Sequence, residues 1–365
     1  MAKCMKCGKV SDDIAEVLLL CAKCIRNADS KSLVQLEAIH ARSRQEFGLP
    51  TSPPTSPDGI QCKLCRNRCQ IPINGRGYCG VRRNENGHLK GGTPGEALVS
   101  WYHDPLPTNC VADWVCAGGS SAGYPQWSHL AGPEHGHTNL AVFYKGCTFN
   151  CLFCQNWHYR ENSQAEQTKT ANELAEAVNA QTSCICFFGG DPTCQLPHAL
   201  AASRLARAQN RQKILRICWE TNGSMNTDLL NEMMDLSIES GGCIKFDLKA
   251  MDAKIHYALC GVDNKQTLEN FAIAAQRISE RPKPPPLVAS TLLVPGYIDV
   301  HEVEAIASFI SKIDPNIPYA LLGFHGDFLM TDLPSTSWKQ AKNCFEAARA
   351  TGLKHVRIGN VHTLT

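Results

Sequence analysis

The sequence lacks several features that would place it in common classes of protein. It has no run of about 18 apolar residues, which a membrane-spanning helix requires. Its opening residues, MAKCMKCGKV, lack the apolar segment of a secretory signal. The 36 lysine and arginine residues nearly balance the 34 aspartate and glutamate residues, so no strong basic field favours nucleic-acid binding. We therefore expect a cytoplasmic protein with neither a membrane nor a nucleic-acid partner.

Cysteine, in contrast, is abundant, with 20 residues in a chain of 365. The cytoplasm keeps thiols reduced, so disulfides do not explain this number. Clustered cysteines in such a compartment indicate metal or iron–sulfur ligands. The composition also suggests an anaerobic or strongly reducing host.

The first cysteine group lies in residues 1–28, where Cys4-x2-Cys7 and Cys21-x2-Cys24 are separated by 13 residues. This spacing is typical of a zinc-ribbon-like module with one tetrahedral four-sulfur site. Four unrelated thiols are the alternative, and spacing alone does not distinguish zinc from iron. Residues 29–59 should form a helix over 29–47 that packs against the rest of the protein, followed by a stiff linker rich in proline and serine.

A second cysteine-rich module is expected over residues 60–137. Four of its cysteines lie within 18 residues, a density that indicates a bound metal, and zinc and an auxiliary iron–sulfur cluster are both open. Cys110 and Cys116 could add ligands, but we expect each to be an ordinary buried thiol. The four predicted ligands are Cys62, Cys65, Cys69 and Cys79.

From residue 138 to 365, short apolar runs alternate with amphipathic stretches, which predicts an α/β fold with parallel strands and right-handed crossovers. So many units favour a partial or full (β/α) barrel, with the active face at the C-terminal ends of the strands. Strands are predicted at 139–145, 184–188, 214–219, 243–248, 287–294, 318–323 and 354–358. Helices are predicted at 170–180, 196–209, 227–238, 265–278, 300–312 and 336–350.

Three cysteines, Cys147, Cys151 and Cys154, directly follow the first of these strands. Three thiolates can hold three irons of a [4Fe–4S] cluster and leave the fourth iron open, which is a property of catalytic sites. The amine and carboxylate of S-adenosylmethionine (SAM) could chelate that iron. The alternative is a zinc site completed by a distant residue such as His158.

The run CTFNCLFC resembles the signature of the radical SAM superfamily. The resemblance implies that Cys147, Cys151 and Cys154 are catalytic, holding a [4Fe–4S] cluster that reductively cleaves SAM to a 5′-deoxyadenosyl radical for hydrogen abstraction. It also implies that Phe153 lies beside the adenine and that a reduced flavodoxin or ferredoxin supplies the electron.

Two further motifs support this resemblance. CFFGGDPT ends the second strand, where glycines let backbone carbonyls approach a ligand closely. By resemblance, Gly189, Gly190 and Asp191 would hold the amino group of SAM, although Asp191 stands where glutamate is commoner. LLGFHGDF ends the sixth strand, and its His325 is the expected adenosine contact.

The fourth strand, IKFDLK, places three charged residues on one face because strand side chains alternate. Lys245, Asp247 and Lys249 should point into the barrel, where Glu220 of the neighbouring strand can join them. Buried charges of this kind must face a ligand or one another, so an internal layer of ion pairs is the alternative.

This segment resembles the pyruvate formate-lyase activating enzymes more closely than the superfamily at large. The resemblance implies that Lys249 contacts the SAM carboxylate. It also implies that Glu220, Thr221 and Asp247 form a monovalent-cation site. Ser290 stands where these enzymes carry a cationic residue, so binding of the SAM carboxylate must differ there or depend on Lys249.

The upstream run CKLCRNRCQIPINGRGYCGVR resembles the activase-like radical SAM proteins of the AmmeMemoRadiSam group. The resemblance covers residues 60–360 and leaves the first module unexplained. It implies activation of a glycyl-radical enzyme, with a protein as substrate. Modification of another protein, an RNA or a small molecule is an alternative, and a non-catalytic iron–sulfur or zinc-ribbon scaffold is another.

Overall fold

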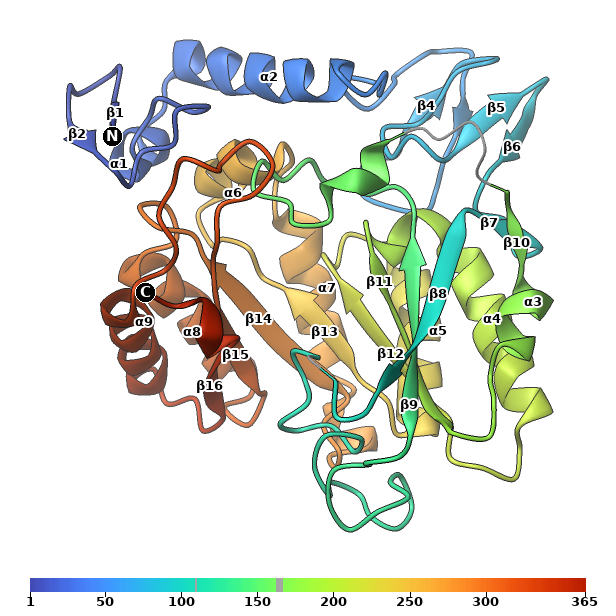
Figure 1. The fold of residues 1–365 in the computed structure, drawn as a ribbon. Coiled ribbons are helices and arrows are strands. Elements are labelled where there is room, and N and C mark those ends of the chain that lie inside the picture. Colours follow the sequence, from blue (N-terminus) through green and yellow to red (C-terminus); the bar gives the residue numbers. More distant parts are fainter. Residues whose placement is uncertain (109, 162–166) are drawn as a thin grey trace.

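A large open sheet forms the centre of the computed structural model, which describes residues 1–108, 110–161 and 167–365 (Figure 1). Its strand order is β16-β15-β14-β13-β12-β11-β9-β8. Seven strands are parallel, and β8 runs antiparallel to β9 at one edge. Within the described residues β8 and β16 each pair with one strand only, so the barrel is partial. The strands are β8 (Val99–Pro105), β9 (Thr138–Tyr144), β11 (Thr182–Gly189), β12 (Arg216–Thr221), β13 (Ile244–Asp247), β14 (Leu287–Leu293), β15 (Tyr319–Gly323) and β16 (Val356–Gly359).

Helices between the strands cover the outer side of the sheet (Figure 1). In α8, Asp299 caps the first turn, and Val303, Ile306 and Ile310 recur at helical spacing on the buried face. The seven predicted parallel strands and the six predicted helices are all present, and α6 is an additional helix that was not predicted. The helices are α3 (Ala171–Glu176), α4 (Leu196–Gln209), α5 (Thr227–Ser240), α6 (Ala253–Cys260), α7 (Lys265–Ala275), α8 (Val300–Ile313) and α9 (Trp338–Ala350).

The N-terminal segments lie over the C-terminal ends of the strands, at the top of Figure 1. The Tyr297 hydroxyl, beyond the end of β14, accepts from the Ala15 amide at 2.9 Å and donates to the Leu20 carbonyl at 3.0 Å. These bonds dock the first module on the sheet. The elements of the first module are β1 (Ala2–Lys3), β2 (Val10–Ser11) and α1 (Ala22–Arg26), and helix α2 (Ser30–Gln45) follows. The next segment contains β3 (Ile60–Gln61), β4 (Gln70–Ile71), β5 (Arg83–Glu85), β6 (His88–Lys90) and β7 (Glu96–Ala97). Strand β7 pairs with β10 (Lys169–Thr170).

Helix α2 packs against the loop that follows β9, as predicted for this helix. The side-chain amide nitrogen of Asn150, Nδ2, donates to His40 Nδ1 at 3.0 Å and to Ser43 Oγ at 2.8 Å. His40 Nε2 lies 3.1 Å from the Ala258 carbonyl, so the neutral ring satisfies both neighbours. Burial lowers the pKa of His40 to about 4, which keeps the ring neutral. The helix therefore supports the cysteine loop from outside.

The opposite end of the sheet is closed by residues 106–137, which form the loop at the bottom of Figure 1. Glu134 in this loop is fully buried and pairs with Arg216 of β12, with 2.5 Å between Oε2 and Nη2. Ser183 Oγ donates to the same carboxylate at 2.7 Å. The loop is thus anchored beneath the sheet, and the C-terminal ends of the strands remain for the site. No helix in the described part of the chain has the length and apolar character needed to cross a membrane.

Candidate active site

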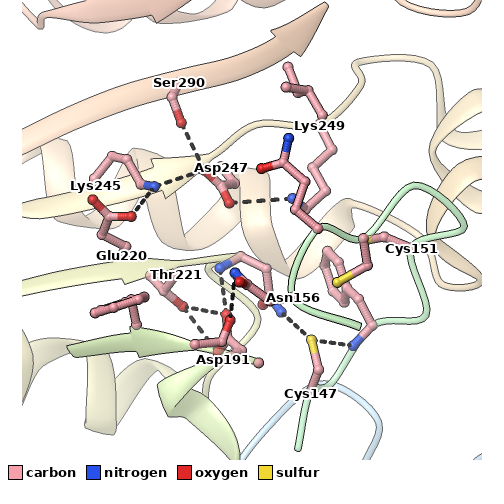
Figure 2. A pocket seen from close by; sticks show the side chains of 18 of the residues that line it. Cys147, Cys151, Asn156, Asp191, Glu220, Thr221, Lys245, Asp247, Lys249 and Ser290 are labelled. Atoms are coloured by element: carbon pink, nitrogen blue, oxygen red, sulfur yellow. Dashed lines mark hydrogen bonds and ion pairs between the residues drawn. The ribbon is translucent and has the colours of Figure 1, made fainter. Parts of the chain in front are cut away.

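A cavity of about 240 Å³ lies at the C-terminal ends of the strands (Figure 2). His325 is outside its lining, but its Nε2 is 2.9 Å from Nε2 of Gln155, which does line it. Residues from the ends of six strands thus meet at one place, as expected for parallel strands. The predicted site residues that line the cavity are Cys147, Cys151, Phe153, Cys154, Gly189, Gly190, Asp191, Glu220, Asp247 and Lys249.

The cysteine loop leaves β9 through Gly146, which has a positive φ of 84°. A Cβ at this position would lie 2.5 Å from Cγ2 of Val81, so glycine is required by conformation and by space. The Cys147 sulfur accepts from the Phe149 amide at 3.4 Å and from Asn222 Nδ2 at 3.8 Å. Burial, with the nearby Asp191 charge, raises the pKa of Cys147, so a metal bound here must displace the thiol proton.

Arg160 is a buried cation behind the three cysteines that sequence reasoning missed. It is 1% exposed, and its Nη2 donates to the Cys151 carbonyl at 3.3 Å. Its Nε and Nη1 have no hydrogen-bond partner among the described residues. The guanidinium carbon lies 4.5 Å from the ring centres of Tyr159 and Phe328. Uncompensated positive charge beside three thiols suits an anionic group held by those thiols.

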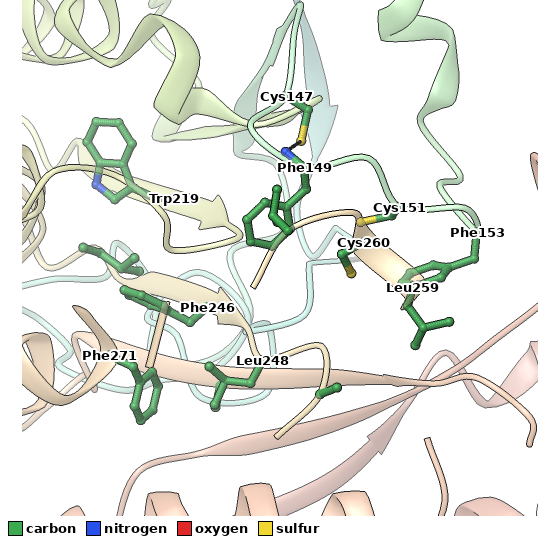
Figure 3. Packing of buried hydrophobic residues seen from close by; sticks show 14 of the residues in the cluster. Cys147, Phe149, Cys151, Phe153, Trp219, Phe246, Leu248, Leu259, Cys260 and Phe271 are labelled. Atoms are coloured by element: carbon green, nitrogen blue, oxygen red, sulfur yellow. Dashed lines mark hydrogen bonds between the residues drawn. The ribbon is translucent and has the colours of Figure 1, made fainter. Parts of the chain in front are cut away.

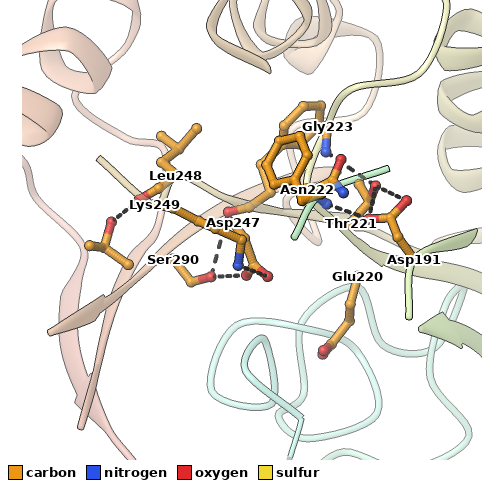
Figure 4. A network of polar contacts seen from close by, with 12 residues as sticks. Asp191, Glu220, Thr221, Asn222, Gly223, Asp247, Leu248, Lys249 and Ser290 are labelled. Atoms are coloured by element: carbon orange, nitrogen blue, oxygen red, sulfur yellow. Dashed lines mark hydrogen bonds and ion pairs between the residues drawn. The ribbon is translucent and has the colours of Figure 1, made fainter. Parts of the chain in front are cut away.

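The Gly189–Asp191 turn ends β11 against the cysteine loop. A Cβ on Gly190 would collide with the Gly146 carbonyl oxygen, so the two loops touch backbone to backbone. The Asp191 carboxylate accepts from the amides of Thr193 at 2.8 Å and Asn222 at 2.7 Å, and from the Thr221 hydroxyl at 3.1 Å (Figure 4). Asp191 therefore ties the ends of β11 and β12 together. Its contact with an amino group of SAM stays a prediction.

Charged side chains of alternating sign cross the cavity floor (Figure 2). Lys245 Nζ lies 2.8 Å from Glu220 Oε2 and 3.3 Å from Asp247 Oδ1. Lys249 Nζ lies 3.3 Å from Asp247 Oδ2, and Ser290 Oγ donates to Asp247 at 2.8 Å. The predicted shared face is confirmed, and its charges form the internal ion-pair layer given as the alternative.

This layer determines the protonation of its members. Burial alone would raise the pKa of Asp247, but Lys245 and Lys249 hold it well below its ordinary value. Burial alone would lower the pKa of both lysines, but Asp247, together with Glu220 beside Lys245 and the nearby thiols beside Lys249, more than offsets this and keeps them charged. Because the ammonium of Lys245 already lies between Glu220 and Asp247, the monovalent cation stays a prediction that must share these carboxylates.

Apolar residues on the other strand face pack behind the site (Figure 3). Phe246 and Leu248 are almost fully buried, and the ring centres of Phe246 and Phe271 are 5.5 Å apart. Beside them Cys260, at the end of α6, hydrogen-bonds to Cys151, which with burial raises the pKa of the Cys151 thiol. Cys260 is thus a fourth nearby thiol, but it does not line the cavity.

Both front groups of cysteines are brought together. The sulfurs of Cys4, Cys7, Cys21 and Cys24 all lie within 4.8 Å of one another, which matches one tetrahedral site. In the second group, burial and the charge of Cys79 raise the pKa of the other three thiols, so all four are neighbours. No three sulfurs of this group lie within 4.8 Å of one another in the described part of the chain. The other three thiols are Cys62, Cys65 and Cys69.

Comparison with known proteins matches one part of the chain to a family. Residues 141–310 match the Radical SAM superfamily. An uncharacterised protein of Methanocaldococcus jannaschii is 25% identical over 308 residues, covering 83% of this chain and 81% of that protein. The isethionate sulfite-lyase activating enzyme of Desulfovibrio desulfuricans is 34% identical over 142 residues, covering 39% of this chain and 41% of the enzyme. The pyruvate formate-lyase 1-activating enzyme of Escherichia coli K12 is 26% identical over 134 residues, covering 35% and 52%.

The chain thus spans about half the length, or less, of these two activating enzymes. The matched range 141–310 begins in β9 and ends in α8, so it contains the cysteine loop, the Gly189–Asp191 turn and the ion-pair layer. Residues 141–310 thus match a radical SAM domain, and a cysteine-rich N-terminal cluster precedes them.

Proposed function

We propose that this protein is a radical SAM enzyme that binds a [4Fe–4S] cluster at Cys147, Cys151 and Cys154 and SAM in the adjoining cavity. When bound, the reduced cluster supplies the electron that cleaves SAM to a 5′-deoxyadenosyl radical, which abstracts hydrogen from the substrate. The observation that carries the proposal is the position of these three thiols on one cavity at the C-terminal ends of the strands.

The residues present fit the cluster. Three thiols and no fourth sulfur line the cavity in the described residues, so one iron would keep a position open for SAM. Arg160, with two unpartnered nitrogens behind these thiols, compensates the negative charge of a thiolate cluster. Both the three thiol ligands and the buried cation therefore support an anionic iron–sulfur group at this position.

The cavity also offers groups for SAM. Lys249 is charged and would bind the methionine carboxylate, while the carbonyls of Gly189 and Gly190 would accept from the amino group. Phe153 lies 5.7 Å from Lys249 Nζ, measured to the ring centre, and would pack against the adenine. His325, beside Gln155, would reach the adenosine. Reduction would come from a small electron-transfer protein such as a flavodoxin or ferredoxin.

Electron paramagnetic resonance (EPR) spectroscopy of the reduced, anaerobically reconstituted protein tests this assignment. We expect a [4Fe–4S] signal that changes on addition of SAM, because SAM would ligate the open iron. A reduced protein with no such signal, or a signal that excess SAM leaves unchanged, would contradict the proposal.

Lys249→Met should weaken SAM binding about 10- to 150-fold. The reason is loss of a charge-assisted hydrogen bond worth about 1.5–3 kcal/mol. Asp247 keeps Lys245 and Ser290 as partners, so the fold and the iron content should survive. Equilibrium binding of radiolabelled SAM measures the effect, with the exposed Lys312→Met as the matched control. Equal affinity in both variants would remove Lys249 from the binding site.

Arg160→Met should make the midpoint potential of the cluster more negative. A buried cation favours the more negative reduced state, and about 1.4 kcal/mol of lost stabilisation corresponds to about 59 mV for one electron. Potentiometric titration followed by EPR measures the shift. Arg204→Met, which removes a surface partner of Glu232, serves as the control and should leave the potential unchanged. A shift of the same size in the control would assign the effect to overall charge.

We propose that the substrate is a backbone glycine of a partner protein. The support is that two of the relatives are named as activating enzymes. Incubating the reduced protein and SAM with a glycyl-radical enzyme from the same organism should produce a protein-based radical, seen by EPR. Deuterium at the partner's glycine should appear in 5′-deoxyadenosine. Cleavage of SAM without deuterium transfer would direct the search to another protein, an RNA or a small molecule.

We further propose zinc at the four thiols of residues 1–28, and zinc or an auxiliary iron–sulfur cluster at the second group. The compact first group suits a single ion, and the wider second group suits a cluster. Zinc and iron per chain should be compared in wild type, Cys4→Ala and Cys62→Ala. Cys4→Ala should lose zinc alone, and unchanged metal content in either variant would refute the corresponding site.

A further inference from the structure

Nine cysteines of the chain belong to none of the three ligand groups described above. Six of these nine line one small cavity at the other end of the sheet, where residues 106–137 close it. A single buried cysteine packs as a small apolar residue and needs no explanation, whereas six around one cavity call for one. The six are Cys110, Cys116, Cys184, Cys186, Cys218 and Cys243.

Four separate segments bring these thiols together. Cys184 and Cys186 are two residues apart on β11 and therefore share a face, and Cys186 pairs in register with Cys218 of β12. Cys243 immediately precedes β13. The other two come from the covering loop, which has no regular secondary structure at that point. Three adjacent strands and one loop thus present sulfur to a common centre.

The sulfur atoms interact in pairs. A hydrogen bond with Cys110, together with burial, raises the pKa of the Cys186 thiol. Cys218 and Cys243 lie close enough to shift each other's pKa, which lowers the pKa of Cys218 to about 7 and raises that of Cys243. Burial and the nearby thiols of Cys110 and Cys218 raise the pKa of the Cys116 thiol. All six cysteines have free thiols, so none is tied up in a disulfide.

Arg281 is a buried cation near this cavity, although it does not line it. Its side chain is 6% exposed and donates to the carbonyls of Pro284 and Gly242, to that of Ile238 at 3.1 Å and to that of Ser237 at 3.3 Å. Within the described residues no carboxylate pairs with it, and the charge-bearing groups that favour its cationic form are Cys243 and Cys218. A buried guanidinium without a counter-ion is costly. Thiolates in this cavity would compensate it.

The spacing of the thiols favours a cluster over a single ion. No three of these sulfurs meet the 4.8 Å limit that Cys4, Cys7, Cys21 and Cys24 satisfy, as judged from the described residues. Inorganic sulfide between irons lets a cluster bridge thiolates that are farther apart than those around one zinc ion. The cavity is about 40 Å³, larger than the roughly 10–15 Å³ that one water needs.

The cysteine cavity is joined to the candidate active site. The Cys110 thiol donates to Glu220 Oε1 at 3.6 Å. Glu220 and the next residue of the loop, Val111, both line the SAM cavity. The cysteine cavity therefore adjoins the candidate active site through Cys110 and Glu220.

We propose that these six cysteines supply the ligands of a second iron–sulfur cluster, held inside the barrel between β11, β12, β13 and the loop that contains Cys110 and Cys116. This cluster is distinct from the one at Cys147, Cys151 and Cys154 and from the front cysteine groups. Its presence does not depend on whether the protein cleaves SAM.

The test is iron and acid-labile sulfide per chain in anaerobically reconstituted protein. Cys186→Ala/Cys218→Ala should lose about two to four irons with matching sulfide, the content of one [2Fe–2S] or [4Fe–4S] cluster. The control is Cys344→Ala, which removes a buried thiol from α9, away from the cavity, and should keep the wild-type content. Equal iron and sulfide in all three proteins would overturn the proposal. Because the readout is content, it stays informative even if SAM cleavage fails.

A second measurement needs no variant. Anomalous scattering from crystals of the reconstituted wild-type protein, recorded above the iron edge, should show a peak among Cys116, Cys186, Cys218 and Cys243. A cavity with no peak would overturn the proposal, and so would a peak that appears only above the zinc edge. These data also cover the case in which the double variant fails to fold.

Discussion

Replacing Glu134 with glutamine is expected to lower the free energy of unfolding by about 3–5 kcal/mol. Glu134 and Arg216 are both buried, and their ion pair joins residues 106–137 to β12. The variant would leave the guanidinium of Arg216 in the interior without its counter-ion. Chemical denaturation measures the effect. The control Glu232→Gln removes the partly exposed partner of Arg204 and should cost about 0–1 kcal/mol.

The same pair makes stability depend on pH. Burial alone would raise the pKa of Glu134, but Arg216 and the surrounding donors hold it at about 2. Because this pKa is below the unfolded value of about 4.3, the stabilisation is present above about pH 4.3 and is lost as the pH falls through about 2. The difference in the free energy of unfolding between wild type and Glu134→Gln should therefore decrease in acid. A difference that stays constant from pH 7 to pH 3 would contradict the ion-pair explanation.

Cys154→Ala should abolish SAM cleavage and remove the SAM-sensitive cluster signal. Two thiolates are too few to hold a cluster with one open iron, and every later step depends on that cluster. Cys260→Ala is the matched control, since this thiol contacts Cys151 but does not line the cavity. The control should keep both the signal and cleavage. The opposite outcome, with cleavage kept by Cys154→Ala and lost in Cys260→Ala, would reassign the ligand set.

Much of the fold could be predicted because each element carries its own local signal. The strands β9 and β11 are continuous apolar runs, as expected for strands buried on both faces, and α8 repeats apolar residues at helical spacing. The edge strand β8 was missed. The residues of this strand, VSWYHDP, are mostly exposed, and they form a strand by pairing with β9. Local sequence patterning does not reveal such a pairing.

The candidate site could be predicted as far as strand ends and alternation allow. Gly189–Asp191 and Lys249 follow parallel strands, so their motifs converge once the topology is known. Arg160 was missed because it lies beyond the cysteine motif. Only its burial and its two unpartnered nitrogens, which the sequence does not show, mark it as part of the site. Asn222 was missed because its contacts with Asp191 and Cys147 cross between loops. The six-cysteine cavity depends on strand order, because its thiols come from four segments separated in sequence.

Formation of 5′-deoxyadenosine tests the central claim most directly. The reconstituted wild-type protein should be reduced with SAM present under strictly anaerobic conditions, and the products separated by chromatography with mass detection. The account predicts 5′-deoxyadenosine and methionine in amounts that require both the reductant and the thiols of Cys147, Cys151 and Cys154. Protein that contains the full cluster, binds SAM and still forms no 5′-deoxyadenosine under reduction would contradict it.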